Sequence, residues 1–226
     1  MPAQALVLDF GGVISRSLFE THALSERELG LVPGTLAWRG PFDPAGDPLW
    51  RDMQADRISE RDYWRVRARE VGRLVGEDWD RMETFVRRVR GADVGAVIRP
   101  EAAAAIGAAK TANKRLAILS NELDLFYGTE FRTRLPLLAR FDVIVDATHT
   151  EILKPDPRAY ALCSGRLGLP GAACVFLDDQ LRNVEGARRA GWQAVHFDMT
   201  EPQRSFDAAL ALLGLPPAVP GSADGR

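Results

Sequence analysis

Acidic, hydroxyl and amide side chains stand where several apolar runs of the sequence end. They are Asp9, Ser120, Asn121, Asp178 and Asp179. The runs before them are the continuous apolar stretches typical of strands buried on both faces of a parallel sheet. The carboxyl ends of parallel strands lie at one edge of the sheet, where open α/β folds bind their ligands. We therefore expect these side chains to surround one site, centred on Asp9.

A single lysine joins this set. Lys154 lies in the stretch Lys-Pro-Asp-Pro, and Lys110 and Lys114 are the only other lysines among 29 basic residues. A compact ammonium group acts as a point charge where a planar guanidinium would not fit. Clustered carboxylates raise one another's pKa unless cations compensate them. Three carboxylates and one lysine leave a charge of about −2, which predicts a divalent cation, and carboxylate and carbonyl oxygens suit Mg²⁺.

Helices and strands alternate regularly from residue 99 onward. The predicted strands are 5–8, 116–119, 142–146, 173–177 and 193–197, and the predicted helices are 100–112, 123–139, 157–167, 182–190 and 206–213. This alternation indicates right-handed βαβ crossovers and an α/β fold, a Rossmann-like, doubly wound parallel sheet with helices on both faces. Residues 1–15 and 92–215 form this predicted core domain. Residues 216–226, rich in Pro, Gly, Ser and Ala, are predicted to be a disordered tail.

Residues 16–91 show no strand pattern and form a predicted α-helical cap domain, inserted so that it folds over the site. Four of the five tryptophans lie here, and we expect them to build the core of the insert rather than to stack on a substrate. Ser59 is a predicted helix N-cap, with Asp62 completing a near capping box. A further helix is expected over 79–89. Prolines mark a loop between the helices, at Pro33, Pro41, Pro44 and Pro48.

Composition limits the possible partners. A net charge of −2 without a one-signed basic stretch argues against nucleic acid. No apolar run approaches the ~18 residues of a membrane span, and the first residues show no secretory signal pattern. Cys163 and Cys174 fit a reducing cytoplasm and are expected to be small buried hydrophobic residues. The expected partner is a small molecule, and the oligomeric state stays open.

Four segments in order resemble the motifs of the haloacid dehalogenase superfamily, in the branch with a helical cap inserted after the first motif (subfamily IA-like). They are residues 9–14 (Asp-Phe-Gly-Gly-Val-Ile), 119–121 (Leu-Ser-Asn), 154–160 (Lys-Pro-Asp-Pro-Arg-Ala-Tyr) and 176–191, which begins Phe-Leu-Asp-Asp. Any one of these segments alone would be a weak signal. The four in order, over roughly residues 4–200, are highly specific.

The resemblance implies a Mg²⁺-dependent hydrolase or phosphotransferase of small phosphate esters. Asp9 would be the nucleophile and would take the phosphoryl group as an aspartyl-phosphate. Ser120 would hydrogen-bond the transferring group, Asn121 would help to shape the site, and Lys154 would neutralise the nucleophile and the phosphate. The implied metal ligands are Asp9, the backbone oxygen of Gly11, Asp178 and Asp179. The charge of −2 left by the three carboxylates and Lys154 predicts a divalent cation without the resemblance.

One position departs from the superfamily pattern. Its phosphatases usually carry a second aspartate two residues after the nucleophile, which acts as general acid and then as base, and here this residue is Gly11. General acid–base catalysis contributes about 10²- to 10⁴-fold, so esters with poor leaving groups should turn over slowly unless the cap supplies a replacement. Candidates by residue type are Glu20, His22 and Asp56, whereas His149 and His196 are expected to be structural.

Two alternatives stay open. In a metal-independent 2-haloacid dehalogenase, Asp9 would attack carbon. Dehalogenases of the superfamily also lack the second aspartate, but without metal Asp178 and Asp179 would form an uncompensated pair. In a binding or regulatory protein, the fold would keep the metal and anion site without turnover.

Overall fold

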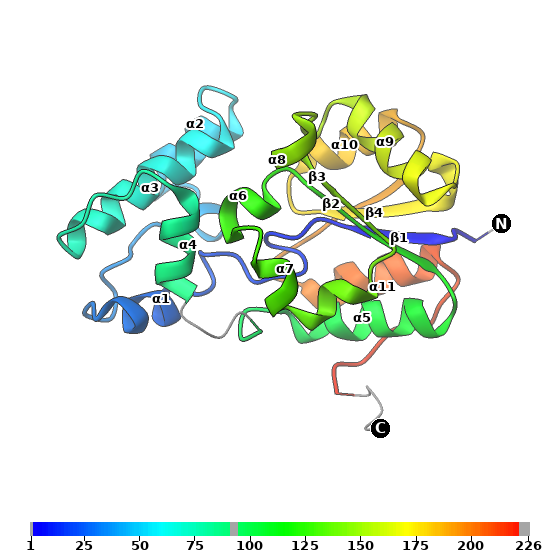
Figure 1. Ribbon diagram of the computed structural model, residues 1–226, viewed down its shortest axis with the longest axis horizontal. Helices are drawn as coiled ribbons and strands as arrows, with labels where there is room; N and C mark the ends of the chain where they lie inside the picture. The colour runs from blue at the N-terminus through cyan, green and yellow to red at the C-terminus, as the bar shows by residue number, and fades with distance from the viewer. Residues whose placement is uncertain (1, 91–94, 222–226) are drawn as a thin grey trace. The chain divides into compact units, whose positions relative to one another are not determined.

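A parallel sheet forms the centre of the computed structural model, which describes residues 2–90 and 95–221 (Figure 1). Its strands are β1 (Ala5–Leu8), β2 (Arg115–Ser120), β3 (Val143–Asp146), β4 (Cys174–Asp178) and β5 (Gln193–His196). They lie in the order β3-β2-β1-β4-β5, and each neighbouring pair is parallel. The winding direction therefore reverses between β1 and β4, as in a Rossmann sheet. The predicted α/β fold is confirmed.

Helices of the described chain cover both faces of this sheet (Figure 1). On one face lie α9 (Pro157–Leu167) and α10 (Leu181–Arg189), and on the other α5 (Pro100–Thr111) and α11 (Pro202–Leu212). All four side chains of β1 are fully buried, as expected for the central strand of such a sheet. No described helix is both long and apolar enough to cross a membrane.

The prediction of one helical stretch over 123–139 is wrong. The segment contains α6 (Leu123–Tyr127), α7 (Phe131–Arg134) and the 3₁₀ helix η2 (Pro136–Arg140). Gly128 has φ +76°, a left-handed conformation that follows the end of α6. Pro136 has no N–H group with which to continue α7, and it begins η2 instead. Two other short helices are η3 (Gly171–Ala173) and α8 (Ala147–Thr150).

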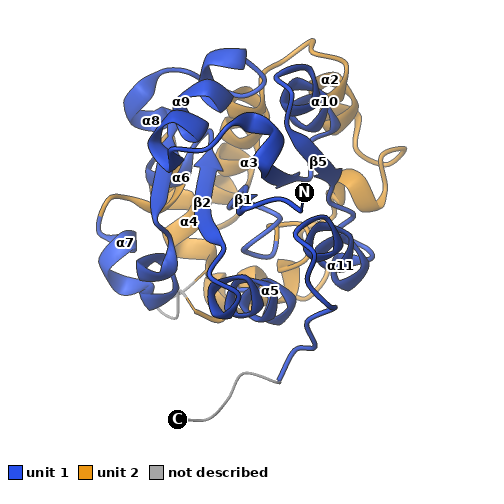
Figure 2. Cartoon of the chain, turned by 90° about the vertical axis from the view of Figure 1, so that its right-hand side faces the viewer, with its two compact units in different colours: residues 1–16, 98–124, 130–226 blue, residues 17–97, 125–129 orange. Residues whose placement is uncertain are grey.

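The chain divides into two compact units (Figure 2). Unit 1 contains residues 1–16, 98–124 and 130–226, and unit 2 contains 17–97 and 125–129. Unit 2 holds α1 (His22–Leu29), η1 (Gly40–Phe42), α2 (Pro48–Gln54), α3 (Glu60–Leu74) and α4 (Met82–Arg90). This division differs from the predicted one at residue 16, which belongs to unit 1, and at residues 95–97 and 125–129, which belong to unit 2. The last of these ranges includes the end of α6. The boundary predicted between residues 91 and 92 lies outside the described residues.

Aromatic side chains form the core of unit 2. The four tryptophans of the insert are buried there, at Trp38, Trp50, Trp64 and Trp79. The ring of Phe19 packs edge-on against two of them, with centroid distances of 5.5 Å to Trp38 and 5.2 Å to Trp50. Buried Asp47 accepts hydrogen bonds from Arg67 Nη2 at 2.6 Å and Tyr63 Oη at 2.9 Å. The tryptophans therefore have the core role predicted for them.

Side-chain caps begin two helices of unit 2. Ser59 Oγ accepts a hydrogen bond from the Asp62 N–H at 3.1 Å, and the Ser59 N–H donates to Asp62 Oδ2 at 3.2 Å, which completes the predicted capping box of α3. Asp47 caps α2 by accepting from the Trp50 N–H at 3.0 Å. Pro48 occupies the first turn of α2 rather than only marking a loop, because that position needs no N–H donor.

The segment after α11 is partly described. Ala218 is buried, and its carbonyl oxygen accepts a hydrogen bond from Gln203 Nε2 at 2.9 Å. The described part of the predicted tail, residues 216–221, therefore contacts α11 through this hydrogen bond. Residues 222–226 of the predicted disordered tail lie outside the described residues.

Candidate active site

Three predicted carboxylates meet at the carboxyl edge of the sheet. Asp9 follows β1 directly, its N–H donates to the Leu177 carbonyl on β4 at 2.9 Å, and Asp178 ends β4. Asp9, Asp178 and Asp179 each offer a carboxylate oxygen within 4.8 Å of the others. This edge lies where the strand order reverses, which is the position at which open α/β sheets bind ligands.

Lys154 bridges two of these carboxylates. Its Nζ donates to Asp9 Oδ1 at 2.8 Å and to Asp178 Oδ2 at 2.6 Å, and the side chain is only 2% exposed. Burial by itself lowers the pKa of Lys154, but the charges of Asp178 and Asp9 and the hydrogen bonds to both outweigh it. The pKa of Lys154 is therefore raised above its usual range, and the ammonium group stays charged at every pH at which the protein would be assayed.

Asn121 fixes the backbone that carries this lysine. Its Oδ1 accepts from the Lys154 N–H at 2.7 Å, and its Nδ2 donates to the Lys154 carbonyl oxygen at 3.2 Å. Ser120, the last residue of β2, is buried, and its Oγ accepts from the Glu122 N–H at 3.4 Å. The loop after β2 is thus connected to the loop that holds Lys154.

The two neighbouring aspartates have different surroundings. Asp178 is fully buried, and its Oδ1 accepts from the Gln180 N–H at 2.8 Å. Asn183 Nδ2 lies 3.1 Å from both of its oxygens. Asn183 is anchored in turn, because Tyr160 Oη donates to its carbonyl oxygen at 2.7 Å. Asn183 is not among the predicted site residues, although its position five residues after Asp178, in the first turn of α10, is a usable signal. Asp179 is only half-buried.

Glycine is required at one of the two positions after Phe10. Gly12 has φ +80°, and a Cβ atom there would lie 2.8 Å from Asp179 Oδ2. The absence of a side chain at Gly12 therefore allows the Asp179 carboxylate to approach the loop closely. Gly11 differs, because it lies outside the left-handed region and a Cβ atom there would meet no atom within 4 Å. A Cβ atom would therefore fit at position 11.

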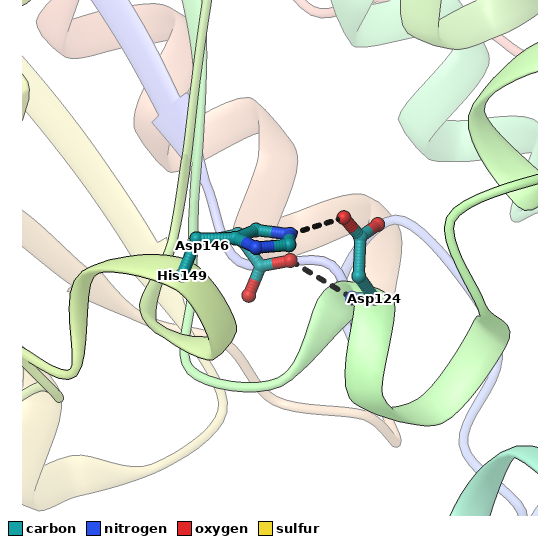
Figure 3. Close-up of side chains that lie close together, drawn as sticks. All are labelled: Asp124, Asp146 and His149. Carbon is teal, nitrogen blue, oxygen red and sulfur yellow. Dashed lines mark hydrogen bonds and ion pairs between the residues drawn. The ribbon is translucent and has the colours of Figure 1, made fainter.

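The donor set of this site fits a hard divalent cation. All three carboxylates offer oxygen, and with Lys154 they carry a formal charge of −2. A second group, Asp124, Asp146 and His149, also clusters in unit 1 (Figure 3).

The second cluster already contains a cation. Arg132 Nη2 lies 2.9 Å from Asp124 Oδ2 and 3.4 Å from Asp146 Oδ2. His149 Nε2 lies 2.6 Å from the same Asp124 oxygen, in keeping with the structural role expected of it. Two carboxylates and Arg132 leave a formal charge of −1 there, against −2 at Asp9, so the cluster at Asp9 is the better cation site.

The proton-donor candidates all belong to unit 2. Burial, and then the nearby charge of Arg39, lower the pKa of His22 to about 4, so its ring is neutral at neutral pH. Glu20 Oε2 accepts from the N–H and the Oγ of Ser17, each at 2.8 Å. Asp56 is exposed and has φ +54°. These surroundings make His22 a weak proton donor near pH 7.

Comparison with known proteins gives one consistent family. Residues 4–191 match the model of the family described as haloacid dehalogenase-like hydrolase. The plasmid protein CbbY of Cupriavidus necator is 32% identical over 245 residues, which cover 97% of this chain and 91% of that protein. The phosphoglycolate phosphatase of Salmonella typhimurium is 25% identical over 138 residues, 55% of this chain and 54% of that protein.

Other matches differ in how much they cover. Acyl-CoA dehydrogenase family member 10 of Mus musculus is 35% identical over 113 residues, and this chain spans only 10% of its length. Among solved structures, magnesium-bound YfnB of Bacillus subtilis aligns with a TM-score of 0.67 at 17% identity, over 95% of this chain and 100% of that one. The structural match supports the α/β fold described above.

Proposed function

Because this chain belongs to the family of haloacid dehalogenase-like hydrolases, we propose that it is a Mg²⁺-dependent hydrolase of small phosphate esters. The observation that carries the proposal is the bridge of Lys154 to Asp9 and Asp178, beside a third carboxylate at the switch point of the sheet. Phosphoryl transfer needs positioning and charge stabilisation above all, and this site offers both. A phosphoglycolate phosphatase among the relatives points to the same class of substrate.

In this proposal Asp9 is the nucleophile. One of its oxygens attacks phosphorus while the bond from phosphorus to the leaving oxygen breaks, and an aspartyl-phosphate forms. Water then attacks phosphorus, releases inorganic phosphate and restores the carboxylate. Lys154, which donates to Asp9 Oδ1, limits the repulsion between the nucleophile and the incoming phosphate. Ser120 hydrogen-bonds the transferring group, and Asn121 holds the Lys154 backbone in place.

The cation would be held by Asp9, the backbone oxygen of Gly11 and the aspartate pair, of which one member would ligate it directly. When bound, Mg²⁺ neutralises the charge of the transferring phosphoryl group. We assign direct ligation to Asp179 and an orienting role to Asp178, because both oxygens of Asp178 already accept hydrogen bonds from protein donors.

A simple assay tests this function. Purified protein is incubated with an activated aryl phosphate, with and without Mg²⁺, and separately with a short 2-haloacid. We expect phosphate release that requires Mg²⁺ and stops when the metal is chelated. The absence of an aspartate at position 11 favours the dehalogenase as second candidate, and halide release without metal would establish it in place of the phosphatase. Silence in both assays would favour a binding or regulatory protein.

Substitution of Gly11 by aspartate is expected to raise turnover. The new carboxylate would supply the missing general acid and base, and its Cβ fits because no atom lies within 4 Å. General acid–base catalysis contributes about 10²- to 10⁴-fold. We therefore expect kcat on alkyl phosphates with poor leaving groups to rise by about 10²-fold or more. The measurement is kcat on an alkyl and an aryl phosphate, and Gly11→Ala is the matched control. An unchanged rate in Gly11→Asp would mean that another group already transfers the proton.

The state of the two cysteines relates to the cellular compartment of the protein. Cys163 and Cys174 are free and buried. Burial raises the pKa of Cys163 to about 12 and that of Cys174 to about 11. Both therefore stay protonated thiols at neutral pH. We propose a cytoplasmic location because a chain of this length with two free cysteines fits a reducing environment.

A further inference from the structure

Arg99 is a buried cation that the proposed mechanism does not use. It immediately precedes α5 and is 3% exposed. Its Nε and Nη2 both donate to the Gly12 carbonyl oxygen, at 3.0 and 2.9 Å. Its N–H donates to the Ile14 carbonyl at 3.0 Å, and its guanidinium lies 5.2 Å from the centre of the Phe197 ring. Arg99 therefore binds the loop after Asp9 at two points.

This loop is held from two directions. The Gly12 carbonyl is fixed by the guanidinium, and the Asp179 carboxylate lies against Gly12, since an added Cβ would be 2.8 Å from its Oδ2. Between the Gly11 and Gly12 carbonyl groups, the only bonds that rotate are the φ and ψ bonds of Gly12. A carbonyl held at Gly12 therefore limits the directions that the Gly11 carbonyl can take. Glycine has no side chain to restrict these rotations by itself.

We infer that Arg99 is a positioning residue for the cation, which keeps the Gly11 carbonyl oxygen and the Asp179 carboxylate in a fixed mutual arrangement. The inference rests on the proposed function, because it takes both groups as metal ligands. A residue that orients a metal ligand without itself contacting the metal commonly matters for affinity, and its removal weakens metal binding. Arginine suits this position because its planar fork makes two charge-assisted bonds to one carbonyl, which a lysine cannot reproduce.

Mg²⁺ titrations of two variants test this role. Arg99→Lys keeps the charge and one donor, whereas Arg99→Gln removes the charge and the fork. Arg188→Lys and Arg188→Gln are matched controls, because Arg188 is exposed and donates to a backbone carbonyl on β5, that of Ala194, at 2.9 Å. Mg²⁺ affinity is measured by calorimetry without substrate, folding by circular dichroism, and kcat and KM with an aryl phosphate.

We expect Arg99→Gln to weaken Mg²⁺ binding by about 10- to 100-fold, with a smaller loss in Arg99→Lys and none in the controls. A Mg²⁺ affinity in folded Arg99→Gln equal to that of the Arg188 controls would overturn the inference, whatever the thermal stability. If Arg99→Gln does not fold, the comparison of Arg99→Lys with Arg188→Lys decides in the same way.

The metal titration also separates this inference from the proposed function. A wild-type protein that binds Mg²⁺ but releases no phosphate would refute the phosphatase, and the affinities would still decide the role of Arg99. A wild-type protein that binds no Mg²⁺ would overturn both.

Discussion

Asp9→Asn should abolish phosphate release, with a loss of about 10⁴- to 10⁶-fold, in the range seen when a catalytic nucleophile is removed. The amide has nearly the shape of the carboxylate but lacks the charged oxygen that attacks phosphorus. The ion pair of Lys154 with Asp178, at 2.6 Å, remains in the variant, so the fold of the site should persist. The rate constant kcat on an aryl phosphate measures the effect.

Two controls make this result specific. Asp207→Asn removes a carboxylate on α11 that accepts a hydrogen bond from Gln203 and belongs to neither carboxylate cluster, and it should keep the full rate. Mass spectrometry of acid-quenched wild-type protein should find a phosphoryl group on the peptide that contains Asp9. Wild-type turnover in Asp9→Asn would rule out this residue as the nucleophile.

The sequence predicts the carboxyl edge of the sheet well, for a physical reason. The residues of β1 are buried on both faces and so form an uninterrupted apolar run, which locates Asp9 at its end. The buried apolar residues of β4 likewise locate Asp178 at the end of that strand. Because all strands are parallel, these ends meet at one edge, and the rarity of lysine among the basic residues of the chain points to Lys154 as their cation.

Contacts between distant parts of the chain have no comparable pattern in the sequence. Arg99 reaches the Gly12 carbonyl across 87 residues, and nothing in its immediate neighbours distinguishes it among the many arginines. The close approach of Asp179 to Gly12 likewise depends on the packed loop rather than on spacing. In residues 123–139 the apolar content favoured one helix. The left-handed conformation of Gly128 and the missing N–H donor of Pro136 divide the segment into shorter helices instead.

Lys154→Met should remove most activity and destabilise the fold. The side chain is 2% exposed and is the ammonium partner of Asp9 and Asp178, so its loss leaves two carboxylates facing each other. Removal of one partner of a buried ion pair costs about 3 to 5 kcal/mol of unfolding free energy. Loss of this charge beside the transferring phosphate should lower kcat by about 10²- to 10³-fold, the usual cost of one group that stabilises transition-state charge. Urea unfolding and aryl phosphate assays measure the two effects.

The control is Lys110→Met, which breaks an exposed pair with Asp142 at 3.7 Å and should cost at most about 1 kcal/mol of unfolding free energy.

The pH dependence of stability gives a second check. The folded pKa of Lys154 is raised, so its contribution is complete below the unfolded value of about 10.4 and is lost only above it. Wild-type stability should therefore show no lysine-dependent loss between about pH 5 and 9. In Lys154→Met, protonation of a carboxylate at low pH, or added Mg²⁺, relieves the repulsion, so the deficit should shrink in both conditions. A deficit that neither acid nor Mg²⁺ reduces would mean that Lys154 stabilises the protein by packing rather than by charge.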